Sequence, residues 1–235
     1  MKNSNDTKPS IVLVHGAFAD GSSWQKVISL AEKRGFNVTA VQNPLKSLAE
    51  DTATTKRVID AQEGAVILVG HSYGGVVITE AAAGSTKVKA LVYVAAFVPD
   101  AGESAGGLME KFPPPPLATA LQPDAAGFLY INRTKFHEVF AQDLPEQEAS
   151  VLGAAQKPLA ASVFGEPVKA AAWKTIPAWY AVSKQDRAIN PELERFMAKR
   201  AQAHITEIDG SHVAFISQPE EIIKIIETAA DATTN

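Results

Sequence analysis

The chain of 235 residues contains no cysteine, and this absence excludes several kinds of site at once. Without a thiol, the protein can form no disulfide, use no cysteine nucleophile and build no zinc site on thiolate ligands. The sequence also lacks a metal-binding spacing such as His-Glu-x-x-His and a phosphate-binding loop. We therefore expect chemistry that uses side chains and backbone alone, with no metal and no cofactor.

An excess of positive charge and a long apolar run are absent too. The 22 lysines and arginines against 26 acidic residues give a net charge of −4, and the basic residues form no cluster. This charge disfavours nucleic acid or an anionic membrane as a partner. No apolar run approaches the roughly 20 residues of a membrane span, and residues 1–9 lack the apolar segment of a secretory signal. We expect a cytoplasmic protein that acts on a small molecule.

Short apolar runs alternate with predicted helices along most of the chain, whose composition is 46% hydrophobic. This alternation predicts an α/β fold, in which a mostly parallel sheet is flanked by helices. The predicted strands are residues 10–14, 37–41, 65–69, 88–96, 176–182 and 204–208. The predicted helices are residues 22–34, 48–62 and 74–83, one that begins at Asn190-Pro191, and one after Ser217, where Ser217 and Glu220 have the spacing of a capping box.

The alternation stops between residues 100 and 175. Four consecutive prolines at 113–116 forbid regular structure, and short helices are predicted after them, separated by further prolines. We interpret residues 100–175 as a helical lid inserted into a core formed by residues 1–99 and 176–235. The four prolines could bind a partner domain as a polyproline ligand, but a stiff hinge at the start of the lid is favoured.

The sequence Gly70-His71-Ser72-Tyr73-Gly74 follows a buried strand directly and opens a helix. This Gly-x-Ser-x-Gly pattern between strand and helix is typical of a tight turn that exposes a serine. The two glycines fit because a side chain there would collide with neighbouring backbone. The amino end of the following helix favours a developing negative charge. We predict that Ser72 is a nucleophile.

A serine hydroxyl needs an imidazole to accept its proton and a carboxylate to orient that imidazole. Of the histidines after Ser72, His137 falls in the predicted lid and His204 begins a strand, whereas His212 lies in a loop just beyond the last strand. We predict His212 as the base. The other two histidines are interpreted as solvated or locally hydrogen-bonded.

Three aspartates compete for the role of the triad acid. Asp186 lies directly past the strand at 176–182, and we favour it as the acid. Asp100, beyond the strand that ends near Phe97, is the main rival. Asp209 lies so close to His212 that we expect it to structure the loop instead.

The reaction also needs two backbone N–H groups for the oxyanion of a tetrahedral intermediate. One is predicted at Tyr73, directly after the nucleophile. The second is assigned to Ala17 in the loop after the first strand, with Phe18 as the alternative, because Gly16 permits close backbone approach. His15 is expected to stabilise this loop by hydrogen bonding.

Together, segments 15–24, 70–75 and 210–212 with Asp186 resemble the α/β-hydrolase superfamily. The nearest branch is the small lidded esterases similar to plant methylesterases and hydroxynitrile lyases and their bacterial relatives, and the resemblance covers nearly the whole chain. It implies the α/β-hydrolase fold without the two leading strands of larger members. Lyases of this type carry threonine at the position of Gly16 and lysine at that of Val213, so the resemblance favours an esterase.

The residues that border the predicted triad are largely apolar. Phe18, Phe97 and Val213 are predicted to contact substrate, which fits a small to medium, uncharged carboxylic ester hydrolysed through an acyl-Ser72 intermediate. Lactone or amide hydrolysis would use the same residues. The alternative from another class is a ligand-binding protein that keeps the fold and uses the pocket for recognition. A homodimer is compatible with the sequence, which does not specify an oligomeric state.

Overall fold

A computed structural model describes residues 8–233 of the chain. Its centre is a six-stranded sheet in the order β2-β1-β3-β4-β8-β9, and all five neighbouring pairs are parallel. The strands are β1 (Ser10–Val14), β2 (Val38–Ala40), β3 (Val66–His71), β4 (Val88–Val94), β8 (Ala178–Ser183) and β9 (His204–Ile208). Each predicted strand is present, so the predicted α/β-hydrolase class of fold is confirmed.

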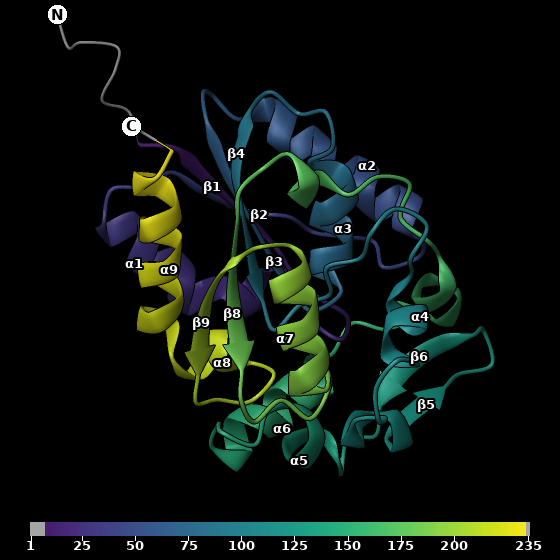
Figure 1. The fold of residues 1–235 in the computed structure, drawn as a ribbon. Coiled ribbons are helices and arrows are strands. Elements are labelled where there is room, and N and C mark those ends of the chain that lie inside the picture. The colour runs from purple at the N-terminus through teal and green to yellow at the C-terminus, as the bar shows by residue number, and fades with distance from the viewer. Residues whose placement is uncertain (1–7, 234–235) are drawn as a thin grey trace, which may run out of the picture.

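Helices cover both faces of this sheet (Figure 1). α1 packs against α9 on one side, and α2 packs against α3 on the other. The helices of the core are η1 (Gly21–Trp24), α1 (Gln25–Lys33), α2 (Leu48–Ala61), α3 (Gly74–Ala81), α7 (Pro191–Arg200), α8 (Ala214–Ser217) and α9 (Pro219–Asp231). The central strands β1 and β3 are buried along their whole length, which explains why they read as continuous apolar runs.

Two helix starts were predicted from capping residues, with different outcomes. Asn190 caps α7 as predicted, since its side chain accepts a hydrogen bond from the N–H of Glu192 at 2.9 Å. The capping box at Ser217 is wrong. Ser217 ends α8, and its hydroxyl donates instead to Asp143 at 2.7 Å, while α9 begins at Pro219 without a side-chain cap.

Residues 95–177 leave the sheet after β4 and return to it at β8; we call this segment the insertion. It contains α4 (Ala105–Met109), η2 (Pro116–Thr119), β5 (Leu121–Pro123), β6 (Phe128–Ile131), α5 (Phe136–Phe140), α6 (Glu146–Ala155), β7 (Leu159–Ala160), η3 (Ala161–Gly165) and η4 (Ala172–Lys174). The expectation of helices alone is wrong here, because β5, β6 and β7 form a small antiparallel sheet. These strands of two to four residues are too short to show an alternating pattern.

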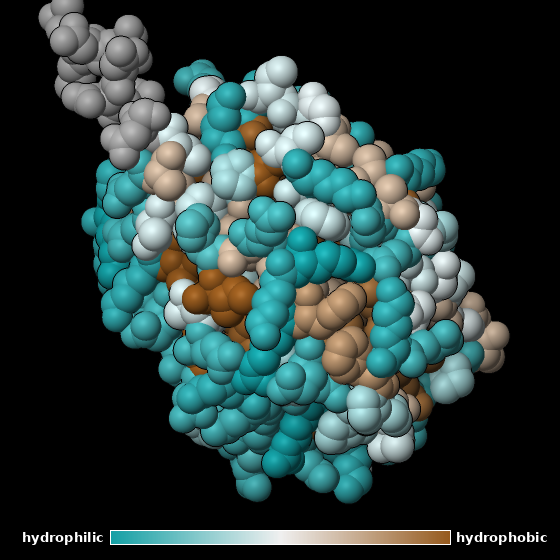
Figure 2. Space-filling model, viewed as in Figure 1, coloured by the Kyte–Doolittle hydropathy of each residue, from teal (hydrophilic) through white to brown (hydrophobic). Residues whose placement is uncertain are grey.

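The insertion lies across the end of the sheet at which a ligand is expected. In Figure 1, α5 and α6 lie below the arrowheads of β8 and β9, which mark the carboxyl ends of the strands. Ligands of open α/β sheets bind at that end. The surface drawn in Figure 2 is mostly hydrophilic, with small hydrophobic areas between polar side chains. None of the described helices is long and apolar enough to cross a membrane.

Candidate active site

Ser72 lies on a strained turn between β3 and α3. Its φ of 54° is in the left-handed region, which non-glycine residues rarely adopt. The flanking glycines are required by space, because a Cβ on Gly70 would lie 2.7 Å from the carbonyl oxygen of Gly74. A Cβ on Gly74 would lie 2.4 Å from the carbonyl oxygen of Val14. The turn therefore has the geometry expected of a nucleophile elbow.

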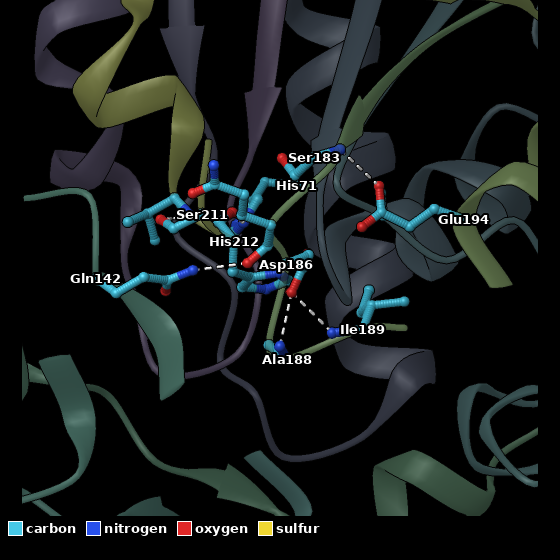
Figure 3. Close-up of polar contacts among 12 residues, drawn as sticks. His71, Gln142, Ser183, Asp186, Ala188, Ile189, Glu194, Ser211 and His212 are labelled. Carbon is cyan, nitrogen blue, oxygen red and sulfur yellow. Dashed lines mark hydrogen bonds and ion pairs between the residues drawn. The ribbon is translucent and has the colours of Figure 1, made fainter. Parts of the chain in front are cut away.

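His212 and Asp186 form a buried pair (Figure 3). His212 Nδ1 lies 2.6 Å from Asp186 Oδ2, and both side chains are almost fully buried. The other oxygen of Asp186 accepts the N–H groups of Ala188 at 2.6 Å and Ile189 at 2.9 Å. Three hydrogen bonds thus hold this carboxylate toward the imidazole. The pairing leaves Nε2 of His212 as the atom that can accept a proton.

The rival acids lie elsewhere. Asp100 forms a partly exposed ion pair with Lys174 at 2.5 Å, and neither residue lines the cavity that contains Ser72. Asp209 accepts a hydrogen bond from Gln185 at 2.9 Å and is exposed. Of the three candidates that the sequence left open, the structure brings only Asp186 to His212.

Ser72 and His212 line one cavity of about 110 Å³ at the end of the sheet. Within residues 8–233, Ser72 Oγ makes no hydrogen bond to His212, so the pair is looser than a reacting pair would be. Catalytic hydrogen bonds are often long without substrate and tighten when it binds. The cavity walls are otherwise apolar. From the core and the insertion they include Phe97, Met109, Leu117, Leu121, Phe140, Phe164 and Ile189.

The predicted oxyanion donors face the same cavity. Ala17, Phe18 and Tyr73 all line it, and the backbone N–H groups of Ala17 and Tyr73 have no acceptor among the described residues. The Tyr73 side chain points away and donates to buried Asp51 at 2.8 Å. Phe18, which follows Ala17 in the loop after β1, has a φ of 61°. The arrangement supplies two free donors beside the nucleophile.

Two further histidines hold the loops of this site in place. His15 Nε2 accepts the N–H of Asn43 at 3.0 Å, so the proton is on Nδ1, which donates to the carbonyl of Gly16 at 2.9 Å. Burial lowers the pKa of His15 to about 4. His71 donates from Nε2 to the carbonyl of His212 at 2.9 Å. Burial lowers the pKa of His71 far below its ordinary value, so both imidazoles are neutral.

Two carboxyl groups that the sequence did not indicate lie beside the predicted triad. Asp143, in the insertion, accepts from the N–H of Ser211 at 2.8 Å and from its hydroxyl at 2.5 Å, in addition to Ser217. It therefore fixes the loop that carries His212. No local pattern indicates this contact, because Asp143 and Ser211 lie 68 positions apart.

The second is Glu194 on α7, which is fully buried beside Asp186 (Figure 3). Its Oε2 accepts the N–H of Ser183 at 3.0 Å, and Oε1 finds no donor among the described residues. Burial, together with the negative charge of Asp186, raises the pKa of Glu194 well above its ordinary range. This shift favours the protonated, neutral form of Glu194, which can donate a hydrogen bond to Asp186.

The residues predicted to contact substrate separate into two groups. Phe97 and Phe18 line the cavity with Ser72. Val213 is absent from that wall, and it lines a second, larger cavity together with Phe18. Within residues 8–233 we find no cluster of histidine and acidic side chains that could hold a metal ion.

Comparison with known proteins defines the class to which this geometry belongs. The profile of the alpha/beta hydrolase family matches residues 11–225, and the chain belongs to that family. It is 25% identical to the alpha/beta hydrolase nvfD of Aspergillus novofumigatus, over 95% of this chain and 97% of the relative. It is also 25% identical to Methylesterase 8 of Arabidopsis thaliana, over 98% of this chain and 93% of the relative. The predicted resemblance is confirmed.

A solved structure agrees with the sequence relatives. The pyrethroid hydrolase of Sphingobium faniae JZ-2 superposes with a TM-score of 0.81 at 25% identity, covering 96% of this chain and 98% of the other. These two relatives and this structural neighbour are hydrolases or esterases, and the protein is accordingly a hydrolase of the alpha/beta hydrolase family.

Proposed function

We propose that the protein is a serine carboxylesterase that hydrolyses small to medium, largely apolar esters through an acyl-Ser72 intermediate. The observation that carries this proposal is the buried His212–Asp186 pair at 2.6 Å, of which His212 lines the cavity that contains Ser72. Two free backbone donors, of Ala17 and Tyr73, face the same cavity. A nucleophile, an oriented base and an oxyanion hole are the parts that acyl transfer needs.

In the proposed reaction, Ser72 Oγ attacks the ester carbonyl while its proton passes to His212 Nε2. The carbonyl oxygen becomes an oxyanion, which the N–H groups of Ala17 and Tyr73 stabilise. Collapse of the intermediate breaks the bond to the alcohol, and His212 protonates the departing oxygen. Water then attacks the acyl-Ser72 with His212 again as base, which releases the carboxylic acid and restores the serine.

Two positions support hydrolysis over hydroxynitrile cleavage. Val213, directly after His212, is an uncharged and buried side chain that cannot stabilise a departing cyanide ion. A Cβ on Gly16 would lie 2.6 Å from Ser72 Cβ and 2.9 Å from the carbonyl oxygen of His71. A threonine at this position would therefore displace the nucleophile from its present place.

The insertion contributes much of the apolar wall of this cavity, which supports its role as a lid over the site. Met109, Leu117, Leu121, Phe140 and Phe164 all come from it. A wall of this composition suits an uncharged acyl group.

The test is hydrolysis of p-nitrophenyl esters, from acetate to octanoate, by the native protein and by Ser72→Ala. We expect turnover by the native protein and a loss of several orders of magnitude in the variant. Circular dichroism and a urea unfolding curve would show that the variant remains folded. If the folded native protein hydrolyses none of these esters, the proposal that it is a general esterase is wrong. Ligand binding unaffected by Ser72→Ala would then favour a binding protein on this fold.

A further inference from the structure

A cavity in the described part of the chain that is much larger than the one at Ser72 is lined by neither Ser72 nor His212. Its volume is about 580 Å³, about five times that of the cavity at the triad. It lies between the insertion helices α5 and α6 and the core segments 18–25 and 213–216. The proposed ester hydrolysis gives this space no role.

Two aromatic rings separate the cavities. Phe18 and Phe140 line both of them, and their rings meet edge to face with centroids 6.2 Å apart. The Phe140 ring also packs against the imidazole of His212, at 4.8 Å between centroids. Among the described residues, these two are the ones that line both cavities. Rotation of their side chains is therefore the direct way to connect the cavities.

The lining defines what the larger cavity can hold. Its walls are mainly apolar and include Phe136, Leu152, Val213, Phe215 and Ile216. Polar residues are present as well, among them two acidic residues, Asp20 and Glu148, and Glu148 pairs with Lys26 at 3.0 Å. An uncharged, apolar group fits such walls, and the acidic residues disfavour an anion.

The volumes show why the triad cavity alone is insufficient. An apolar cavity of about 150 Å³ is large enough to bind benzene. At about 110 Å³, the triad cavity accepts a short acyl group but has no further room for an aromatic one, whereas the second cavity accommodates two rings. Both halves of a bulky ester can therefore be buried only if one half enters the second cavity.

The place of the second cavity relative to His212 indicates which half of the ester, acyl or alcohol, enters it. His212 protonates the departing alcohol, so the alcohol oxygen must lie next to its imidazole. The Phe140 ring is packed on that same imidazole and forms part of the partition. The alcohol half is thus the half that adjoins the second cavity.

We propose that this cavity is an alcohol-side subsite, which takes a bulky, uncharged apolar alcohol group when Phe18 and Phe140 part, while a short acyl group occupies the cavity at Ser72. The proposal rests on the proposed esterase function and names its substrate class. It predicts a preference for short-chain esters of bulky aromatic alcohols.

Helix α6 offers a matched pair of variants for the test. Ala155 is exposed to solvent and lines the cavity, whereas Ala154, the preceding residue, is also exposed but does not line it. Ala155→Phe would fill the subsite, and Ala154→Phe adds the same ring on another face of the helix. Because both alanines are exposed, neither change places a ring in the packed interior, and urea unfolding midpoints would verify the fold.

The experiment compares kcat/KM for 2-naphthylmethyl acetate with that for ethyl acetate. We expect Ala155→Phe to lower the ratio of the two values at least tenfold and Ala154→Phe to leave it within twofold. Equal effects of both variants on the ratio, or no effect of either, would overturn the proposal. If Ser72→Ala abolishes hydrolysis of both acetates but Ala155→Phe leaves it unchanged, the subsite is wrong and the esterase function is supported.

A binding measurement tests the subsite in the opposite case, in which the esterase function is wrong and no ester is hydrolysed. Isothermal titration calorimetry of Ser72→Ala with 2-naphthylmethanol measures binding without any turnover. We expect binding that the additional Ala155→Phe change weakens at least tenfold. If this binding is found although no ester is hydrolysed, the cavity is a ligand site and the esterase function is wrong. If no binding is found in either background, the subsite is wrong.

Discussion

The core loops and the insertion contribute to the candidate site in different ways. The core supplies the proposed reacting groups, Ser72, Asp186 and His212, each directly after or close behind a strand of one sheet. The insertion, which is built from short helices and strands, supplies apolar walls and one anchor, Asp143. The difference indicates a division of labour, in which chemistry depends on the sheet and substrate choice depends on the insertion.

The largest expected effect tests this division with two aspartates. Asp186→Asn should lower kcat about 10³–10⁴-fold, because an amide cannot hold the imidazole in the required tautomer or stabilise its charged form. Asp100→Asn, at the start of the insertion, removes an exposed ion pair and should change kcat less than twofold. Steady-state kinetics with p-nitrophenyl acetate measures both. A large loss in Asp100→Asn would transfer the role of the acid to the insertion.

Acid should destabilise the core through its buried histidines. His15 has a pKa of about 4 in the fold and an ordinary value of 6.5, so the unfolded chain binds more protons between these values. Stability is therefore lost as the pH falls from about 6.5 toward 4, by about 3 kcal/mol for this residue. Urea unfolding at pH 7 and pH 5 measures the loss.

The control for this measurement is a pair of glutamine variants. His15→Gln removes the titrating group and should reduce the difference between the two pH values, whereas His204→Gln changes an exposed histidine and should not. Asp51 acts in the opposite direction in the same range, because burial raises its pKa to about 6. Comparing variants cancels that contribution. Identical pH dependence of all three proteins would contradict a neutral, buried His15.

A smaller effect is expected where the insertion touches the core. Asp143→Ala removes three hydrogen bonds to Ser211 and Ser217 and should lower kcat/KM about 10–100-fold, with Asp143→Asn in between. Hydrogen exchange of residues 209–213 should accelerate in the same order. Asp124→Ala, an exposed aspartate in another part of the insertion, is the control. Unchanged exchange in Asp143→Ala would mean that the loop needs no anchor.

The smallest effect concerns the protonation of Glu194. A glutamine has the shape of the neutral acid and can still accept from Ser183 while donating to Asp186, so Glu194→Gln should keep kcat/KM within about threefold and leave the pH profile unchanged. Glu194→Met removes both hydrogen bonds and should cost about tenfold. If Glu194 is instead ionised, the glutamine variant will shift the acid limb of the profile by about one pH unit or more.

Much of the core was predictable because its signals are local. The glycines around Ser72 are demanded by backbone contacts within the turn and with β1, and the flanking strand and helix are recognisable by their own residues. Chain order then limited the acid and base to a few candidates. The sequence already favoured Asp186 over Asp100 and Asp209, and the fold places Asp186 alone of the three at His212.

The insertion was less predictable for physical reasons. Its strands have at most four residues, too few to establish a period, and its prolines suggested only interruptions. Asp143 and Glu194 look like ordinary surface charges in the sequence, and Ser217 matches a capping pattern that Asp143 overrides. Likewise, Val213 follows the base in sequence, but its side chain faces the other cavity. Such contacts depend on packing between segments far apart in the chain.

The bonds between Asp143 and the His212 loop have a kinetic consequence. Any movement that lifts this part of the insertion away from the sheet withdraws the acceptor from Ser211 and Ser217, and so loosens the base at the moment the site admits water or releases product. The enzyme would then be reactive only while closed. The turnover rate would then depend on how long the insertion stays closed over the site.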